Sequence, residues 1–140
     1  MHRASCEGYI VLKPDSYGLY AARQRIRGVT EELRLPKDQA DSLLIAVGEA
    51  VSNAYRHGAP NPTIDLIRLS WRHDVSGLVV TIKDDGNGFG KNPRFCPSDR
   101  PGSLARGLEL MRACVDEVRF ISDRGGTVVL RKRIKLLRQP

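Results

Sequence analysis

The chain has 140 residues, of which 41% are hydrophobic and 28% are charged, and its formal net charge is +7. This length suits one domain around one core, and the composition is that of a globular protein rather than a disordered one. The longest apolar run, Leu43–Val47, is far too short to cross a bilayer, and the N-terminus lacks the apolar stretch of a signal peptide. We therefore expect a single domain over residues 1–140, a cytoplasmic location and no membrane partner.

The spacing of the cysteines and the distribution of charge argue against a zinc or redox protein and against a nucleic-acid-binding protein. Cys6, Cys96 and Cys114 are odd in number and widely spaced, which favours reduced thiols over a zinc or redox centre. Much of the positive charge lies in the C-terminal stretch RKRIKLLRQP, which we interpret as a solvated tail. Because the sequence has neither zinc-finger spacing nor an aromatic-rich strand that could stack bases, we expect no direct binding of nucleic acid.

The first part of the chain predicts one strand and two amphipathic helices. Residues 8–13 are typical of a strand, and Ser16 is placed to cap the helix that follows. Pro36 ends this helix, and a second one is expected from about Lys37 to Gly58. The two apolar stripes recur at three- and four-residue steps and consist of Leu19, Ala22, Ile26, Val29 and Leu33 in the first helix and Ala40, Leu43, Leu44, Val47, Val51 and Ala54 in the second.

Two strands and a long loop are predicted next. Residues 63–72 alternate poorly, because Ile64 and Leu66 are in one phase while Leu69 and Trp71 are in the other, as a bulge or burial on both faces would explain. Residues 78–84 alternate cleanly through Leu78, Val80 and Ile82. Residues 86–102 are rich in Gly, Pro, Asn and Asp, which indicates a long loop of the kind that forms lids.

The last part predicts a third helix and a β-hairpin. Leu104, Leu108, Met111 and Val115 form the stripe of the helix. The hairpin comprises residues 117–122 and 127–134 around a turn at Gly125-Gly126, and its inner face is expected at Val128, Leu130 and Ile134. The order β-α-α-β-β-loop-α-β-β is not a regular βαβ alternation. It predicts an α+β fold, a two-layer sandwich in which helices cover one face of a mixed, mostly antiparallel sheet.

Polar residues recur every four positions along the second helix. Glu49, Asn53 and His57 are spaced by about one turn each, so they share a face that points away from the apolar stripe. An amide oxygen can bind Mg²⁺, and a nearby carboxylate can orient or deprotonate a nucleophile. The pattern is compatible with a phosphoryl-transfer site, and also with an ordinary solvated helix face.

Two glycine-containing segments follow the strand predicted over residues 78–84. Asp84 ends a clean strand and could accept a hydrogen bond from an amino group such as that of adenine. Gly86 and Gly88 would allow close backbone approach, although D-G and N-G also occur in simple turns. Further on, Gly107 is expected where a loop becomes a helix, whose N–H groups could bind phosphate oxygens beside the positive charge of Arg106.

Together these segments resemble the GHKL ATPases, a superfamily that includes gyrase, a heat-shock chaperone, sensor histidine kinases and mismatch-repair ATPases. E-A-x-x-N-A-x-x-H-G at 49–58 resembles the N box, and D-x-G-x-G-F at 84–89 resembles the G1 box. R-G-L at 106–108 resembles the G2 box, and Gly126-Thr127 the last motif. The chain is similar, over about residues 11–134, to the bacterial anti-sigma factor serine/threonine kinases of the sporulation and general-stress type.

The resemblance implies a histidine-kinase-like ATPase domain of the Bergerat type that binds ATP and Mg²⁺. Glu49 would be the catalytic carboxylate and Asn53 the magnesium ligand. Asp84 would accept a hydrogen bond from the adenine amino group, and Thr127 would assist it. The other positions at the nucleotide would be His57, Gly86, Gly88, Arg106, Gly107 and Leu108, and we expect His57 to be structural or to contact the lid rather than to catalyse.

The implied activity is that of a protein kinase with regulatory partners. Such a protein sequesters a sigma factor and phosphorylates an anti-sigma factor antagonist of the STAS type on Ser or Thr. It is usually a homodimer, for which the helix around Ala21 to Val29 and the first strand are candidate surfaces.

Three positions depart from the family pattern. Ala105 stands where the G2 box usually has its first glycine, Gly126 stands where the last motif often has Thr, and Glu109 replaces an aromatic or small residue. These departures leave an alternative open, a nucleotide-binding regulatory module of the same fold with little or no kinase activity. A detached sensor-kinase ATPase domain is less favoured, because the phosphoacceptor helix is missing and the lid is short.

Overall fold

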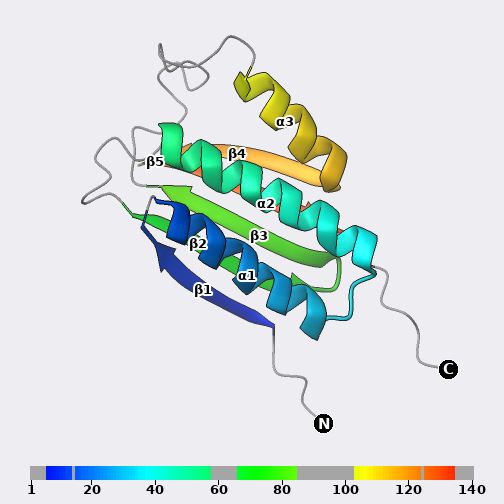
Figure 1. The fold of residues 1–140 in the computed structure, drawn as a ribbon. Coiled ribbons are helices and arrows are strands. Elements are labelled where there is room, and N and C mark those ends of the chain that lie inside the picture. The colour runs from blue at the N-terminus through cyan, green and yellow to red at the C-terminus, as the bar shows by residue number, and fades with distance from the viewer. Residues whose placement is uncertain (1–5, 14, 58–65, 85–102, 124, 135–140) are drawn as a thin grey trace, which may run out of the picture.

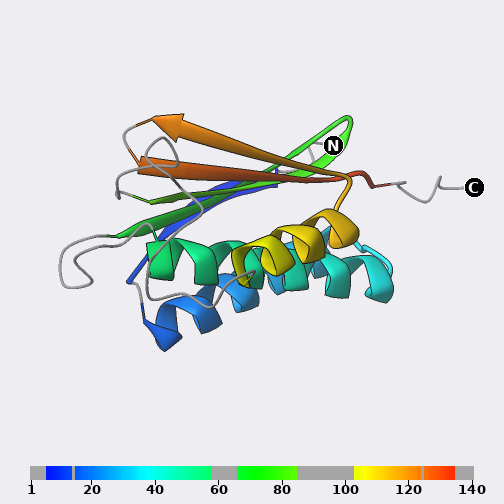
Figure 2. The same ribbon diagram turned by 90° about the horizontal axis from the view of Figure 1, so that it is seen from above.

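The computed structural model describes residues 6–13, 15–57, 66–84, 103–123 and 125–134. Within them, five strands form one sheet and three helices pack on one of its faces, which gives two layers when the molecule is seen from above (Figure 2). The predicted α+β, two-layer architecture is therefore confirmed. No helix among these residues has the length and apolar character that crossing a bilayer requires.

The sheet is built from β1 (Glu7–Leu12), β2 (Ile67–Asp74), β3 (Gly77–Asp84), β4 (Glu117–Asp123) and β5 (Gly125–Lys132). Across the sheet the order is β1-β2-β3-β5-β4 (Figure 1). All four neighbouring pairs are antiparallel, so the sheet formed by the described residues is not mixed. The last strand of the chain, β5, lies between β3 and β4 and joins the final hairpin to the rest of the sheet.

The irregular alternation predicted around β2 has a simple origin. The strand begins at Ile67, and from there Ile67, Leu69 and Trp71 are buried in a single phase. Leu66 lies before the strand and is exposed, so its opposite phase does not conflict with the pairing. Within the described strand the register to β3 is continuous from Ile67 to Asp74, and no bulge interrupts it.

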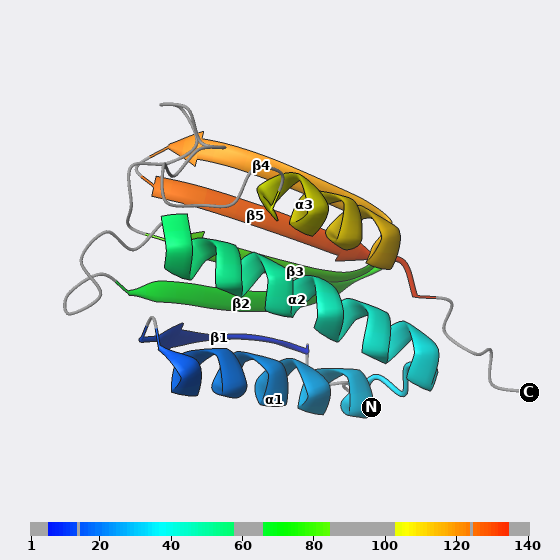
Figure 3. The same ribbon diagram turned by 45° about the horizontal axis from the view of Figure 1, so that its top comes forward.

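The helices are α1 (Ser16–Glu32), α2 (Lys37–His57) and α3 (Ser103–Cys114). In Figure 3, α2 lies between α1 and α3, with α1 over the β1 edge of the sheet and α3 over the β4–β5 edge. The predicted cap of α1 was wrong by one residue: Asp15 is the N-cap, and its Oδ1 accepts a hydrogen bond of 2.9 Å from the Gly18 N–H. An aspartate oxygen caps a helix as well as a serine oxygen, so composition alone did not decide between the neighbours.

The core lies between the three helices and the inner face of the sheet. The predicted stripes of α1 and α2 are buried there except at their ends, where Leu19, Leu33 and Ala40 are half-buried. The α2 helix also buries Ala46 and Ala50 completely, because neighbouring helices pack on both of its sides. Each large aliphatic side chain removed from water in this way contributes about 1.5–3 kcal/mol. The largest fully buried residues are Ile26, Thr30, Leu43, Val47, Val51, Ile67, Leu69, Leu78, Val80, Ile82, Met111 and Leu130.

Candidate functional site

Two helices bring together three of the residues that the sequence singles out. Glu49 and Asn53 lie one turn apart on α2, and Gly107 of α3 faces both of them. A Cβ added to Gly107 would lie 3.5 Å from Glu49 Oε2 and 3.6 Å from Asn53 Nδ2. Glu49 is half-buried and also lines a hollow of about 240 Å³ between α1 and α2, whereas Asn53 is only 8% exposed.

The amide of Asn53 is bonded at one end only within the described residues. Its Oδ1 accepts a hydrogen bond of 3.3 Å from Arg56 Nη2, while the buried Nδ2 has no hydrogen-bond partner among them. Buried polar atoms are rarely left in this state unless water, an ion or a ligand meets them. A neutral amide oxygen beside a carboxylate also matches the oxygen ligands of Mg²⁺, so this pair of residues fits the metal that the motif implies.

Asp84 forms a second cluster at the end of β3. It is 5% exposed, and its Oδ1 accepts a hydrogen bond of 3.0 Å from the backbone N–H of Gly126. Gly125 has φ +114°, and a Cβ there would collide with the carbonyl oxygen of Asp84, so the close approach of β5 requires glycine. Because a carboxylate accepts several hydrogen bonds at once, the bond from Gly126 is compatible with a further donor such as the amino group of adenine.

Thr127 does not join Asp84 in the structure. It pairs across the sheet with Lys83, and strand alternation places both residues on the outer face. Asp84 is buried in the same phase as Ile82, on the inner face that the helices cover. Asp84 instead accepts a hydrogen bond from the backbone N–H of Gly126, a residue that the sequence analysis had assigned to a turn. Both Gly125 and Gly126 belong to β5, and the G-G pair at the start of a strand was the only signal for this contact.

The start of α3 corrects the expected place of Gly107. The helix begins at Ser103, so Gly107 lies in its second turn rather than at the junction of loop and helix. The N–H groups without an intrahelical acceptor therefore lie at the start of the helix, before Gly107. Because Gly107 has no side chain, it leaves space next to Glu49 and Asn53. Arg106 is exposed on the same helix and Leu108 is half-buried.

The roles of all the predicted site residues remain predictions, and three of these residues lie wholly or partly outside the description. His57 is the last residue of α2, but the position of its side chain lies outside the description. Gly86 and Gly88 lie outside the described residues altogether. Arg56 was missed by the sequence reasoning, and its spacing of three residues from Asn53 was the signal that could have revealed it.

The two clusters lie at the same end of the molecule. Figures 1 and 3 show the C-terminal ends of α2 and β3 beside the first residues of α3 and β5. Asn53, near the C-terminal end of α2, and Asp84, the last residue of β3, therefore belong to segments at the same end of the fold. Such an arrangement can hold a nucleotide base at one point and a metal-bound phosphate chain at another.

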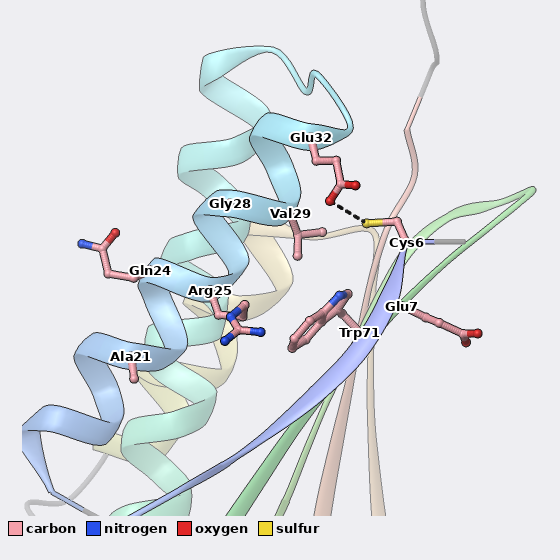
Figure 4. Close-up of a pocket in the computed structure, with 9 residues that line it drawn as sticks. All are labelled: Cys6, Glu7, Ala21, Gln24, Arg25, Gly28, Val29, Glu32 and Trp71. Carbon is pink, nitrogen blue, oxygen red and sulfur yellow. Dashed lines mark hydrogen bonds between the residues drawn. The ribbon is translucent and has the colours of Figure 1, made fainter. Parts of the chain in front are cut away.

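A cavity of about 630 Å³ lies elsewhere, between α1 and the β1 edge of the sheet (Figure 4). Its wall includes Trp71, with the guanidinium of Arg25 5.6 Å from the ring centroid. The Cys6 thiol donates to Glu32 Oε2 at 3.8 Å, and burial, followed by this carboxylate, raises the pKa of the thiol. None of the predicted nucleotide residues lines this cavity, so we place the candidate site at α2, α3 and β3, where the polar groups converge.

The family model described as the histidine kinase-like ATPase domain matches residues 12–132. The chain therefore belongs to this family, and the resemblance seen in its motifs is confirmed.

Two named relatives align with most of this chain. The serine-protein kinase RsbW of Bacillus subtilis (strain 168) is 27% identical over 135 residues, which cover 89% of this chain and 84% of that protein. The anti-sigma F factor of Geobacillus sp. (strain WCH70) is 28% identical over 120 residues, 81% of this chain and 82% of that one.

Solved structures agree with the fold. The crystal structure of the RsbU and RsbW domains of a Mycobacterium tuberculosis protein superposes with a TM-score of 0.69 at 21% identity. The match covers 91% of this chain and 32% of that longer one. The histidine kinase domain of a blue-light activated histidine kinase from Erythrobacter litoralis gives a TM-score of 0.58 at 20% identity, over 82% of this chain and 60% of that one. At these identities the superpositions support the fold alone.

Proposed function

We propose that this protein is an ATP-dependent serine/threonine protein kinase that also acts as an anti-sigma factor. It would bind a sigma factor and phosphorylate an anti-sigma factor antagonist of the STAS type. The observation that carries this proposal is the convergence of Glu49 and Asn53 on Gly107, with the buried carboxylate of Asp84 at the same end of the molecule. The names of the relatives, a serine-protein kinase and an anti-sigma F factor, support the same class.

Each residue has a distinct part in the proposed reaction. The Asp84 carboxylate accepts a hydrogen bond from the adenine amino group while the Gly126 N–H holds it in place. The Asn53 amide oxygen holds Mg²⁺, which when bound neutralises charge on the phosphates. The Glu49 carboxylate orients or deprotonates the acceptor hydroxyl of the substrate protein. Arg106, exposed on α3, supplies positive charge to the phosphate chain.

The second candidate function is nucleotide binding at the same site with little or no phosphate transfer. Gly126 and Ala105 depart from the family pattern at positions near the nucleotide, which favours a nucleotide-gated binding module with little turnover. In both versions we propose a cytoplasmic homodimer, with α1 and β1 as the dimer surface. The cavity beside Trp71 lies between these two elements.

Phosphate transfer to the antagonist separates the two functions. Wild type with Mg·ATP should place phosphate on Ser or Thr of the antagonist encoded beside it, as located by mass spectrometry. Glu49→Gln should keep ATP affinity within a few-fold and lose about 10²-fold or more of the transfer rate, the scale of one positioned acid–base group. Glu117→Gln, at an exposed position on β4 and away from the proposed dimer surface, is the matched control and should transfer normally.

Two outcomes would change the proposal. If wild type transfers no phosphate to the antagonist but binds a sigma factor, the binding module is the better description. If Glu49→Gln transfers phosphate as fast as wild type, the protein remains a kinase and Glu49 is not its catalytic carboxylate.

A further inference from the structure

Arg56 contacts the residue that the proposed function makes the metal ligand. It follows Asn53 by three positions on α2, and its Nη2 donates a hydrogen bond of 3.3 Å to Asn53 Oδ1. Asn53 is only 8% exposed, whereas Arg56 is an exposed residue. The guanidinium therefore reaches from the surface to the buried amide and covers the oxygen by which Asn53 would hold Mg²⁺.

The contact also determines which way the amide faces. Oxygen and nitrogen of an Asn side chain are distinguished only by their hydrogen bonds. Nδ2 is buried toward Gly107 and has no partner among the described residues, whereas Oδ1 has the guanidinium. Within the described part of the chain, the bond from Arg56 is thus the hydrogen bond that orients this side chain.

A guanidinium and a magnesium ion cannot share this oxygen favourably. Both are cations, and at hydrogen-bonding and coordination distances from one atom they would repel each other strongly in a buried site. The nitrogen of the amide offers no alternative, because it only donates. Binding of the metal at Asn53 and the hydrogen bond from Arg56 therefore exclude each other.

We propose that Arg56 is a positioning residue that occupies Asn53 Oδ1 in the metal-free protein and leaves it when Mg·ATP binds, so that it sets the magnesium concentration needed for nucleotide binding. The inference rests on the proposed function, because it assumes that Asn53 binds the metal. The departure of Arg56 requires little rearrangement, since its side chain already lies at the surface and can turn to solvent.

The magnesium dependence of ATP binding tests the proposal. The concentration of Mg²⁺ that gives half-maximal ATP binding should fall about three- to ten-fold in Arg56→Met, the effect of one ordinary hydrogen bond, since the exposed charge of Arg56 is screened by water. Arg56→Lys keeps a donor and the charge and should restore the wild-type requirement. Arg112→Met removes the same charge from an exposed position in the last turn of α3 and should leave the requirement unchanged.

A second readout needs no nucleotide. In ¹⁵N-labelled protein, the side-chain amide resonances of Asn53 should shift in metal-free Arg56→Met relative to wild type, because the amide loses its hydrogen bond. Adding Mg·ATP to wild type should shift the same resonances, while Asn53→Ala identifies them by their loss. Thermal unfolding of each variant checks that the helix end remains folded.

The outcomes separate this proposal from the kinase assignment. An unchanged or increased magnesium requirement in Arg56→Met would overturn the proposal, and an increase would instead make Arg56 a contact of the triphosphate. If wild type binds no ATP at any Mg²⁺ concentration, the proposed function itself fails. The resonances of Asn53 then still decide the remaining claim, because no shift in Arg56→Met would show that the two side chains do not interact.

Discussion

Replacing Gly107 by alanine separates the stability of α3 from the use of the space beside Asn53. Gly107 is an interior residue of α3, where glycine costs about 0.5–1 kcal/mol relative to alanine. The new methyl carbon would lie 3.5 Å from Glu49 Oε2 and 3.6–3.9 Å from the amide of Asn53, which are ordinary van der Waals distances. We therefore expect Gly107→Ala to fold and to melt roughly 2–4 °C higher than wild type.

Nucleotide binding should change in the opposite direction. The methyl group fills the space between α3 and the two side chains to which the proposed function assigns metal and catalysis. Displacing one charge-assisted contact of the phosphate chain costs about 1.5–3 kcal/mol, which is about 10- to 100-fold in affinity. Calorimetric titration with Mg·ATP, beside a thermal melt of the same sample, measures both effects.

Gly28 provides the matched control. It is an exposed interior residue of α1, and a Cβ there would meet nothing within 4 Å. Gly28→Ala should give a similar gain in melting temperature without any change in ATP affinity. If Gly107→Ala binds Mg·ATP like wild type, the space beside Asn53 is not part of the nucleotide site. If it is less stable than wild type while Gly28→Ala is more stable, the packing argument for α3 is wrong.

Three further substitutions test other parts of the molecule. Asp84→Asn should lower ATP affinity severely yet fold normally, because an amide oxygen can accept the hydrogen bond from the same backbone N–H. Wild type should bind GTP much more weakly than ATP, since guanine has a carbonyl where adenine has its amine. Equal affinities for the two nucleotides in calorimetry would contradict this role of Asp84. Lys83 lies directly opposite Arg68 on the outer face, so the two positive charges repel each other. Lys83→Thr should therefore raise the free energy of unfolding by about 0.2–1 kcal/mol in urea titrations at low salt. Added salt should reduce this gain if repulsion is its cause. The hydroxyl and N–H of Ser76 lower the pKa of Asp74 to about 2, so the ionised carboxylate stabilises the fold above about pH 4 and this contribution is lost as the pH falls through 2. In acid titrations, Asp74→Asn should therefore lose less stability between pH 4 and 2 than wild type. Equal losses in the two proteins would exclude the effect.

The sequence by itself determined the elements and the class of the fold. The stripes of α1 and α2 and the alternation of β3 are local patterns, because a helix or strand needs only the right period of apolar residues to bury one face. The motif around Glu49 and Asn53 was equally readable, since two residues four apart on a helix share a face in any tertiary setting. The family match over residues 12–132 confirms what those motifs indicated.

Details that depend on more than one element could not be read in this way. Whether Asp15 or Ser16 caps α1 depended on which oxygen reaches the Gly18 N–H. The start of β2 at Ile67 depended on where pairing with its neighbours begins, and this removed a conflict of phase that the sequence alone presented.

The composition of the site was decided by tertiary structure. Asp84 meets Gly126 across 42 positions of sequence, because β5 inserts beside β3 and the register turns Thr127 to the other face. Gly107 meets Glu49 and Asn53 only because α3 packs against α2. Strand order, register and helix packing are chosen by burial of the whole core, and a shift of one residue in a strand reverses the face of every side chain. Local spacing therefore indicated candidate residues for the site, and long-range packing decided which of them meet.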